Sequence, residues 1–337
     1  MKNVKRILVI RIDFLGDMVC TTAFLHALKA RWPTAEIHVL ANTYNRSVLD
    51  GNPDVSAVHT YVYSKQCERN DRPGRLRSLV DRFNLILRLR RLKFDLLIVP
   101  NGGRHKNSIQ FARQLGVTDS RWHDERSEFD DRVPEHAANR PIRHEALSGF
   151  MLVPELGEVD AHELKLHVYP DPSLRAQWLA ALGPRRRPRV GLFVSNKAAE
   201  RRWEARKWNR LASTLAEHAD VIVFRDPRES AGADRSGIAN VREVSPPTVP
   251  ELIAAMSALD LVISADSAPV HLAAALGVPV VALFENRPEK WGRWHPLGVR
   301  HVVLREGRCV SDIGVEAVER AAISLLVAAT MDDRSWA

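Results

Sequence analysis

The chain has 337 residues, a length that suits two α/β domains of roughly 150 residues each better than one core. Hydrophobic residues make up 45% and charged residues 27% of the sequence, a balance typical of a folded, soluble protein that excludes a disordered or membrane-spanning chain. The net charge of +8 favours an anionic partner. We expect a phosphorylated small molecule or an anionic membrane surface and no nucleic acid, because the sequence contains no helix-turn-helix, zinc-finger or aromatic RNA-binding pattern.

The start of the chain and its cysteines indicate the cellular compartment in which the protein works. The first apolar run, Ile7 to Ile10, is too short for a signal sequence, and no stretch reaches the roughly 18 apolar residues that a membrane span requires. We therefore expect a cytoplasmic protein. Cys20, Cys67 and Cys309 are widely spaced and odd in number, so we expect neither a disulfide framework nor a metal site built from cysteines.

The first half opens with a βαβ pattern. Residues 6–12 form a continuous β-branched run that is typical of a strand buried on both faces of a parallel sheet. Residues 18–32 have helical apolar spacing, and residues 36–40 and 55–62 predict two further strands.

A basic helix and a weakly patterned segment follow. Residues 75–93 interleave apolar side chains with arginines and predict an amphipathic helix, and residues 95–100 predict another buried strand. The basic helix is either a solvated surface or a contact for phosphorylated lipid or the inner leaflet of the membrane, where each basic residue gains roughly 1 kcal/mol. Residues 104–145 are polar and lack clear periodicity, which is typical of binding loops.

A second α/β block begins near Arg189, after the linker-like residues 184–188. Its apolar runs predict strands at 190–195, 221–224, 261–264 and 278–284, with helices at 203–218, 249–258 and 268–276. Strands that alternate with helices predict a parallel, doubly wound sheet in each half. Ligands of such sheets bind at the carboxyl ends of the strands.

Asp17 lies in the expected turn between the first strand and the first helix, at a strand carboxyl end. Gly16 permits a tight turn there. The carboxylate of Asp17 can accept a proton from a hydroxyl group if partial burial raises its pKa. The alternative is that Asp17 caps the helix that starts at Met18, which is the commoner role of an aspartate in this place. Asp13 is a neighbouring and weaker candidate.

The run from residue 264 to 284 is the most informative in the chain. Asp266 and Ser267 end a strand, and Pro269 stands where a first helical turn tolerates it. The free N–H groups of that turn form an anion site that suits a pyrophosphate, and His271 can donate a hydrogen bond to the same anion. The alternatives are a helix cap at Asp266 or Ser267 and a buried core position for His271.

Two loops are expected to reach the same crevice. The loop that starts at Ser195 and Asn196 and runs to Arg201 brings hydroxyl, amide and cationic groups that suit a diphosphate leaving group. The loop at 225–229 follows the next strand, where an acidic side chain can hold ribose hydroxyls. Each loop also has a plain interpretation as protein surface.

In combination these motifs resemble glycosyltransferase family 9, the bacterial lipopolysaccharide heptosyltransferases. The resemblance is carried in chain order by residues 6–22, by Arg201-Arg202-Trp203, by residues 266–275 and by residues 291–298, so it covers nearly the whole chain. It implies the GT-B type of α/β fold, in which two Rossmann-like, doubly wound parallel-sheet domains face each other across a cleft.

The resemblance also implies a reaction. A heptose passes from ADP-heptose to a lipopolysaccharide core acceptor with inversion and no obligatory metal, and Asp17 holds the position of the family's proposed base. Asp266, Ser267 and His271 match the donor-binding helix motif. Glu229 matches the acid that holds the ribose, and Arg201 matches a lysine that supports the phosphates.

The residue patterns and the resemblance together predict a donor site and a division into domains. We expect a donor site formed by Ser195, Asn196, Arg201, Glu229, Asp266, Ser267, Ala268, Pro269 and His271. We expect an acceptor-binding domain at residues 1–168, a donor-binding domain at 185–312, and a C-terminal helix at 313–337 that packs back toward the first domain. No cofactor and no metal are expected.

The chain departs from the family pattern at two places. Arg201 and Glu204 stand where the family usually has lysine and proline, and Ala268 adds a methyl group where glycine often precedes Pro269.

Two other functions stay open. One alternative function is transfer of heptose or a hexose to a protein or another glycan. The other is a non-catalytic nucleotide-sugar-binding protein in which Asp17 serves only as a helix cap.

Overall fold

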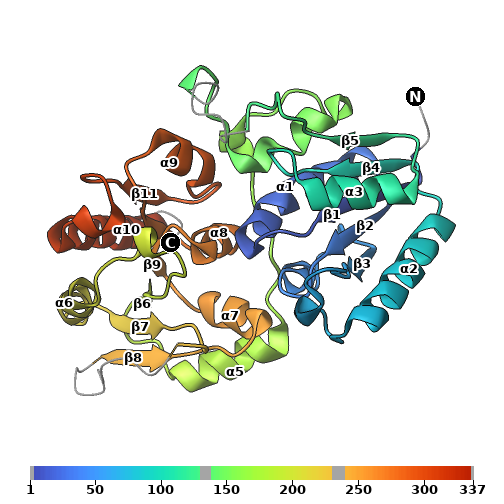
Figure 1. The fold of residues 1–337 in the computed structure, drawn as a ribbon. Coiled ribbons are helices and arrows are strands. Elements are labelled where there is room, and N and C mark those ends of the chain that lie inside the picture. The colour runs from blue at the N-terminus through green and yellow to red at the C-terminus, as the bar shows by residue number, and fades with distance from the viewer. Residues whose placement is uncertain (1–3, 130–137, 230–239, 335–337) are drawn as a thin grey trace. The chain divides into compact units, whose positions relative to one another are not determined.

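The structure is a computed structural model that describes residues 4–129, 138–229 and 240–334. The chain divides into two compact units, Met1–His167 and Val168–Ala337. Each unit is built around its own parallel sheet with helices packed on it (Figure 1). The predicted α/β class, with a parallel sheet in each half of the chain, is confirmed.

The sheet of the first unit has the strand order β3-β2-β1-β4-β5, and every neighbouring pair is parallel. The strands are β1 (Arg6–Arg11), β2 (Glu36–Ala41), β3 (Ala57–Thr60), β4 (Leu96–Val99) and β5 (Ser120–Trp122). From β1 the chain passes to β2 on one side and later to β4 on the other. The crevice at the carboxyl ends of β1 and β4 is therefore the switch point of this sheet, where α/β proteins bind ligands.

The helices of the first unit are α1 (Leu15–Arg31), α2 (Arg75–Arg91) and α3 (Lys106–Leu115). Helices α2 and α3 share one core with the strands, in which Leu89 and Phe111 pack near Leu8 and Leu97. Residues 104–145, which we expected to lack regular structure, contain α3 and β5. The helix was missed because it spans only about three turns within a segment that is otherwise rich in polar residues.

The sheet of the second unit has the order β11-β10-β9-β6-β7-β8 and is also parallel throughout. Its strands are β6 (Arg189–Phe193), β7 (Asp220–Phe224), β8 (Val241–Val244), β9 (Leu261–Ala265), β10 (Val280–Leu283) and β11 (His301–Leu304). Its helices are α5 (Pro172–Leu182), α6 (Ala205–Leu215), α7 (Val249–Met256), α8 (Ala268–Ala275), α9 (Pro288–Trp294) and α10 (Val315–Arg334). Strand β6 pairs with β7 on one side and β9 on the other, so the switch point lies between β6 and β9.

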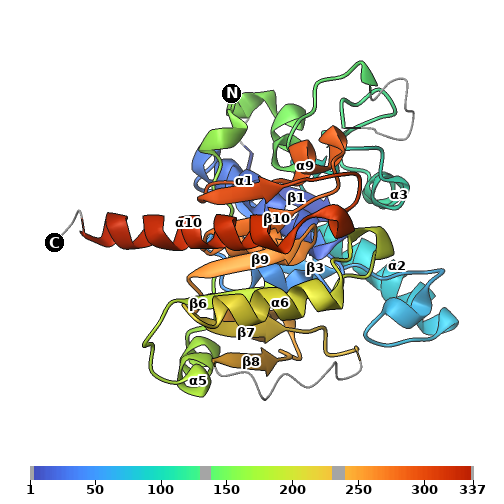
Figure 2. The same cartoon turned by 90° about the vertical axis from the view of Figure 1, so that its left-hand side faces the viewer.

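The C-terminal helix α10 packs on the sheet of the second unit. Val318, Ala322 and Leu325 are buried in one core cluster with Trp208 of α6 and residues of the central strands. Figure 2 shows α10 and α6 side by side over these strands. The apolar face of α10 thus packs on its own sheet, and the expected packing of residues 313–337 toward the first domain stays a prediction. In the described part of the chain, no helix is long and apolar enough to cross a bilayer.

Candidate active site

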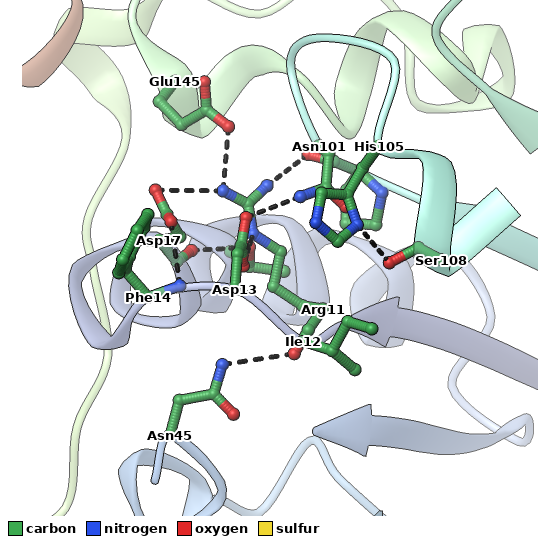
Figure 3. Close-up of polar contacts among 12 residues, drawn as sticks. Arg11, Ile12, Asp13, Phe14, Asp17, Asn45, Asn101, His105, Ser108 and Glu145 are labelled. Carbon is green, nitrogen blue, oxygen red and sulfur yellow. Dashed lines mark hydrogen bonds and ion pairs between the residues drawn. The ribbon is translucent and has the colours of Figure 1, made fainter. Parts of the chain in front are cut away.

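One buried guanidinium collects three carboxylates at the switch point of the first sheet. Arg11, the last residue of β1, is 1% exposed. Its Nε lies 2.8 Å from Oδ1 of Asp13, and its Nη2 lies 2.9 Å from Oε1 of Glu145 and 3.1 Å from Oδ1 of Asp17 (Figure 3). We call Arg11, Asp13, Asp17 and Glu145 the carboxylate cluster. With all four groups ionised it carries one positive and three negative charges, so a proton is attracted to it.

Asp17 lies inside the first turn of α1 and not in a turn before it. Its Oδ2 accepts the backbone N–H of Phe14 at 3.1 Å, while its Oδ1 faces Arg11. Asp17 thus caps the helix and also takes part in the cluster. The helix starts at Leu15, three residues earlier than the apolar spacing predicts, because this carboxylate satisfies the first N–H group. Gly16 is helical and is not among the glycines with positive φ, so the expected tight turn at Gly16 is wrong.

Burial changes the proton affinity of the cluster. Burial raises the pKa of Asp17, an effect that the charge of Arg11 opposes and that of Glu145 strengthens. Burial likewise raises the pKa of Asp13 well above its usual range, again against the opposing effect of Arg11. Burial and the charge of Arg11 lower the pKa of the nearby His105 to about 4, so this imidazole is neutral at physiological pH. The cluster therefore offers carboxylates that bind protons more tightly than ordinary aspartates.

Neighbouring groups hold these carboxylates in place. The side-chain amide of Asn101, just after β4, donates to Oδ2 of Asp13 at 2.5 Å. The backbone N–H of Gly102 donates to Oε1 of Glu145 at 3.2 Å. A Cβ at position 102 would stand 2.6 Å from Oε2 of Glu145, so only glycine allows this close approach. The carboxylates are therefore fixed from two strand ends and from the 3-10 turn at Glu145–Leu147.

Sequence reasoning missed Arg11, Asn101 and Glu145. A signal was present for Arg11, because a charged residue at the end of an otherwise apolar, buried strand needs a charged partner. Glu145 stands 134 residues away from Arg11 and lies in the segment without clear pattern.

The switch point of the second sheet brings together three of the expected donor-site residues. The amide of Asn196, after β6, donates to the backbone oxygen of Asp266 at 3.0 Å. Arg201 Nη1 lies 3.2 Å from Oδ2 of Asp266, which follows β9. Burial raises the pKa of Asp266, while Arg201 and Lys290 oppose this shift. Lys290, on α9, was not among the expected residues.

Ser195 and Glu229 form a second pair at the same edge of the sheet. The hydroxyl of Ser195 donates to Oε2 of Glu229 at 2.6 Å and accepts the N–H of Asp226 at 3.0 Å. Asp226 is held by Arg228 at 2.6 Å, and this hydrogen bond lowers the pKa of Asp226 to about 2. Of the two acids in this loop, Glu229 is thus the one that Ser195 positions.

The start of α8 has the character of an anion site. Ser267 is the N-cap, but its hydroxyl donates to the backbone oxygen of Ala265 at 2.9 Å. The side chain of Ser267 therefore does not cap the helix that Ala268 and Pro269 open. His271 is 3% exposed and lies edge-to-face with Trp294, with ring centroids 5.9 Å apart. It occupies the buried position that the sequence left as an alternative.

The comparison with known families decides the class of protein. Residues 82–319 match the family model described as "Glycosyltransferase family 9 (heptosyltransferase)", which is more than half of the chain. The chain belongs to glycosyltransferase family 9. It is therefore a glycosyltransferase of the heptosyltransferase-like kind, as the motifs indicate. The matched range starts after the carboxylates of Asp13 and Asp17, so the argument for these two residues comes from the structure.

Relatives with an assigned role point the same way. The chain is 25% identical over 341 residues to lipopolysaccharide heptosyltransferase 3 of Escherichia coli strain K12, a match that covers 92% of this chain and 95% of the relative. It is 24% identical over 290 residues to a second Escherichia coli protein of that name, with 80% and 81% of the two chains covered.

Solved structures share the fold. A glycosyltransferase family 9 protein from Veillonella parvula has a TM-score of 0.77 at 20% identity, with 97% of this chain and 98% of that chain covered. ADP-heptose lps heptosyltransferase II of Escherichia coli has a TM-score of 0.73 at 19% identity, with 96% and 99% covered. An Escherichia coli heptosyltransferase solved with ADP has a TM-score of 0.71 at 16% identity, with 95% and 99% covered. The GT-B fold implied by the motifs is therefore confirmed.

Proposed function

We propose that this enzyme transfers a heptose from ADP-heptose to a lipopolysaccharide core acceptor, with inversion at the anomeric carbon. The observation that carries the proposal is the division of chemistry between the two switch points. Carboxylates of raised pKa gather at the first, and an arginine, amides and an uncapped helix start gather at the second. The names of the Escherichia coli relatives, and the one solved with ADP, support the choice of donor and acceptor.

Asp17 is the base of the proposed reaction. An acceptor hydroxyl must lose its proton as its oxygen attacks the anomeric carbon, and a carboxylate of raised pKa accepts that proton more readily than an ordinary one. Arg11 keeps Oδ1 of Asp17 in place, and the N–H of Phe14 holds Oδ2. Positioning of the hydroxyl and the donor carbon at attack distance lowers the activation free energy by several kcal/mol more. For well-oriented reactants this contribution reaches about 7–11 kcal/mol.

The second unit holds the donor in this proposal. Arg201, Asn196 and the first N–H groups of α8, at Ser267 and Ala268, bind the diphosphate. Pro269, which has no N–H group, fixes the first turn of the helix. Negative charge grows on the diphosphate as its bond to the sugar breaks, so these groups favour the transition state over the bound donor.

The remaining donor-site residues have supporting roles. Glu229 accepts hydrogen bonds from the ribose hydroxyls, and Ser195 fixes its orientation. In this proposal His271 and Asp266 do not contact the ribose but hold the first turn of α8 in position beside the diphosphate. Because a cation and backbone amides neutralise the leaving group, the proposal includes no metal and no other cofactor.

The place of action follows from the acceptor. A lipopolysaccharide precursor is held in a membrane by its lipid part, so we propose that the enzyme acts in the cytoplasm at the surface of the inner membrane. The basic helix α2 is the element that we assign to this contact.

Titration calorimetry with ADP, UDP and GDP, in the presence of EDTA, tests the donor and the metal together. We expect ADP to bind at least about tenfold more tightly than either of the others, which corresponds to about 1.4 kcal/mol. Transfer from ADP-heptose, followed as ADP release that depends on a core acceptor, should be unchanged by EDTA. Equal affinity for the three nucleotides would contradict the proposed donor, and loss of transfer in EDTA would contradict the metal-free reaction.

A further inference from the structure

Helix α2 carries apolar side chains on two opposite sides. On the inner side, Leu85 and Leu89 are buried in the core that α2 shares with the strands. The spacing of a second set, at positions i, i+3, i+4 and i+7, places it together on one face turned away from that core. We call this set the outer stripe: Leu76, Leu79, Val80 and Phe83, with exposed fractions of 81, 56, 58 and 60%.

The outer stripe is unusual for a helix on a protein surface. A helix with a buried face normally carries polar residues on its opposite face, because apolar side chains gain nothing from contact with water. Figure 1 shows α2 on the outside of the first unit's sheet. Four large apolar side chains that lie together on such a face mark a binding surface.

The charges around the outer stripe are almost all positive. Arg75, Arg77, Arg88 and Arg91 are exposed on the same helix. Asp81 is the single acidic residue in the sequence of α2, and its Oδ1 lies 3.4 Å from Nη2 of Arg72. An apolar stripe with arginines on both sides is typical of a helix that lies in the interface of an anionic membrane.

The positive surface continues onto α3. Arg82 and Arg90 of α2 donate to the side chain and the backbone oxygen of Gln114 at 3.0 and 2.9 Å, which fixes the two helices to each other. Beside them lies an open groove of about 500 Å³ on α3, lined by Arg104, Lys106 and Arg113, of which Arg104 is ion-paired with Glu125. The surfaces of both α2 and α3 thus carry cations that can contact lipid phosphates.

We propose that α2 lies flat in the surface of an anionic bilayer, with the outer stripe among the acyl chains and the flanking arginines at lipid phosphates. The purpose of this contact rests on the proposed function, because the contact would bring the enzyme to a lipid-anchored acceptor. A second copy of this chain fits the same face less well, because two identical faces packed about a twofold axis would bring arginines against arginines.

Sedimentation of the full-length protein with vesicles tests the proposal. We expect binding to phosphatidylcholine vesicles that contain phosphatidylglycerol and little binding to vesicles without it. Leu76→Gln combined with Phe83→Gln should lower the partition coefficient by at least about tenfold, because two large side chains no longer leave water. Arg77→Gln combined with Arg88→Gln should lower it several-fold and reduce its salt dependence.

Controls separate the outcomes. Ile323→Gln on α10 removes an apolar side chain of 37% exposure outside the outer stripe and should leave binding unchanged. Circular dichroism shows whether each variant is folded, and transfer to a delipidated, water-soluble acceptor should be unaffected by the α2 changes. Unchanged vesicle binding of the Leu76/Phe83 variant, or a dimer in solution that this variant abolishes, would overturn the proposal. Absence of transfer with intact vesicle binding would instead contradict the proposed function alone.

Discussion

Replacement of Asp17 by asparagine is expected to lower kcat about a thousandfold, which lies within the range that general-base catalysis contributes. The amide oxygen can still accept the N–H of Phe14, so the start of α1 is retained. We expect the free energy of unfolding to change by less than about 1 kcal/mol, because the lost contact with Arg11 is offset by burial of a neutral group next to Glu145. Steady-state kinetics of ADP release and urea unfolding measure the two effects.

Asp13→Asn is the matched control, since Asp13 lies in the same cluster and contacts the same Arg11. Its kcat should fall by less than about tenfold if Asp17 alone is the base. In the wild type, kcat/KM should decline as the pH falls through the raised pKa of Asp17, at a pH above the ordinary aspartate value of about 4. The residual activity of Asp17→Asn should lack this decline. Unchanged turnover would remove Asp17 from the reaction.

Replacement of Arg11 by methionine is expected to lower the free energy of unfolding by about 3–5 kcal/mol at about pH 8. The change leaves three buried carboxylates without the cation that they share. The pKa values of Asp13 and Asp17 in the folded state, which burial already raises, then rise further above those in the unfolded chain, so the folded state binds more protons. Stability is therefore lost as the pH rises through this window and regained as it falls. Urea unfolding at several pH values should show the deficit shrink toward about pH 5.

Arg6→Met is the control for this experiment. Arg6 begins the same strand, but its ion pair with Glu36 is half exposed, so a loss of less than about 1 kcal/mol with little dependence on pH is expected. Addition of Glu145→Gln to Arg11→Met should restore part of the stability, because it removes one of the unpaired charges. Equal losses for Arg6→Met and Arg11→Met, or a deficit that does not vary with pH, would show that Arg11 does not serve the cluster through its charge.

Much of the fold could be predicted because buried parallel strands have a strong local signal. The apolar runs at Arg6–Arg11 and Leu261–Ala265 lie between polar turns, and both were expected within one residue at each end. The start of α1 was missed because Phe14 at its N-cap gives no capping signal, and the signal is instead Asp17 at the third helical position.

The candidate donor site was easier to predict than the candidate base site. Asn196, Arg201 and Asp266 come from loops that directly follow neighbouring strands, so the topology brings them together. Arg11 and Glu145 meet only because the segment after β5 folds back onto the first sheet, which no local pattern indicates. The partner of a buried charge is in general a long-range property of the fold, whereas the need for a partner can be read from the sequence.

Titration of ADP into Asp17→Asn and Arg201→Gln tests the division of chemistry between the two switch points most directly. We predict that Asp17→Asn binds ADP with wild-type affinity, and that Arg201→Gln binds it at least about tenfold more weakly because a charged contact to the diphosphate is lost. Weakened binding in Asp17→Asn together with unchanged binding in Arg201→Gln would contradict the assignment of the base to the first unit and of the donor to the second.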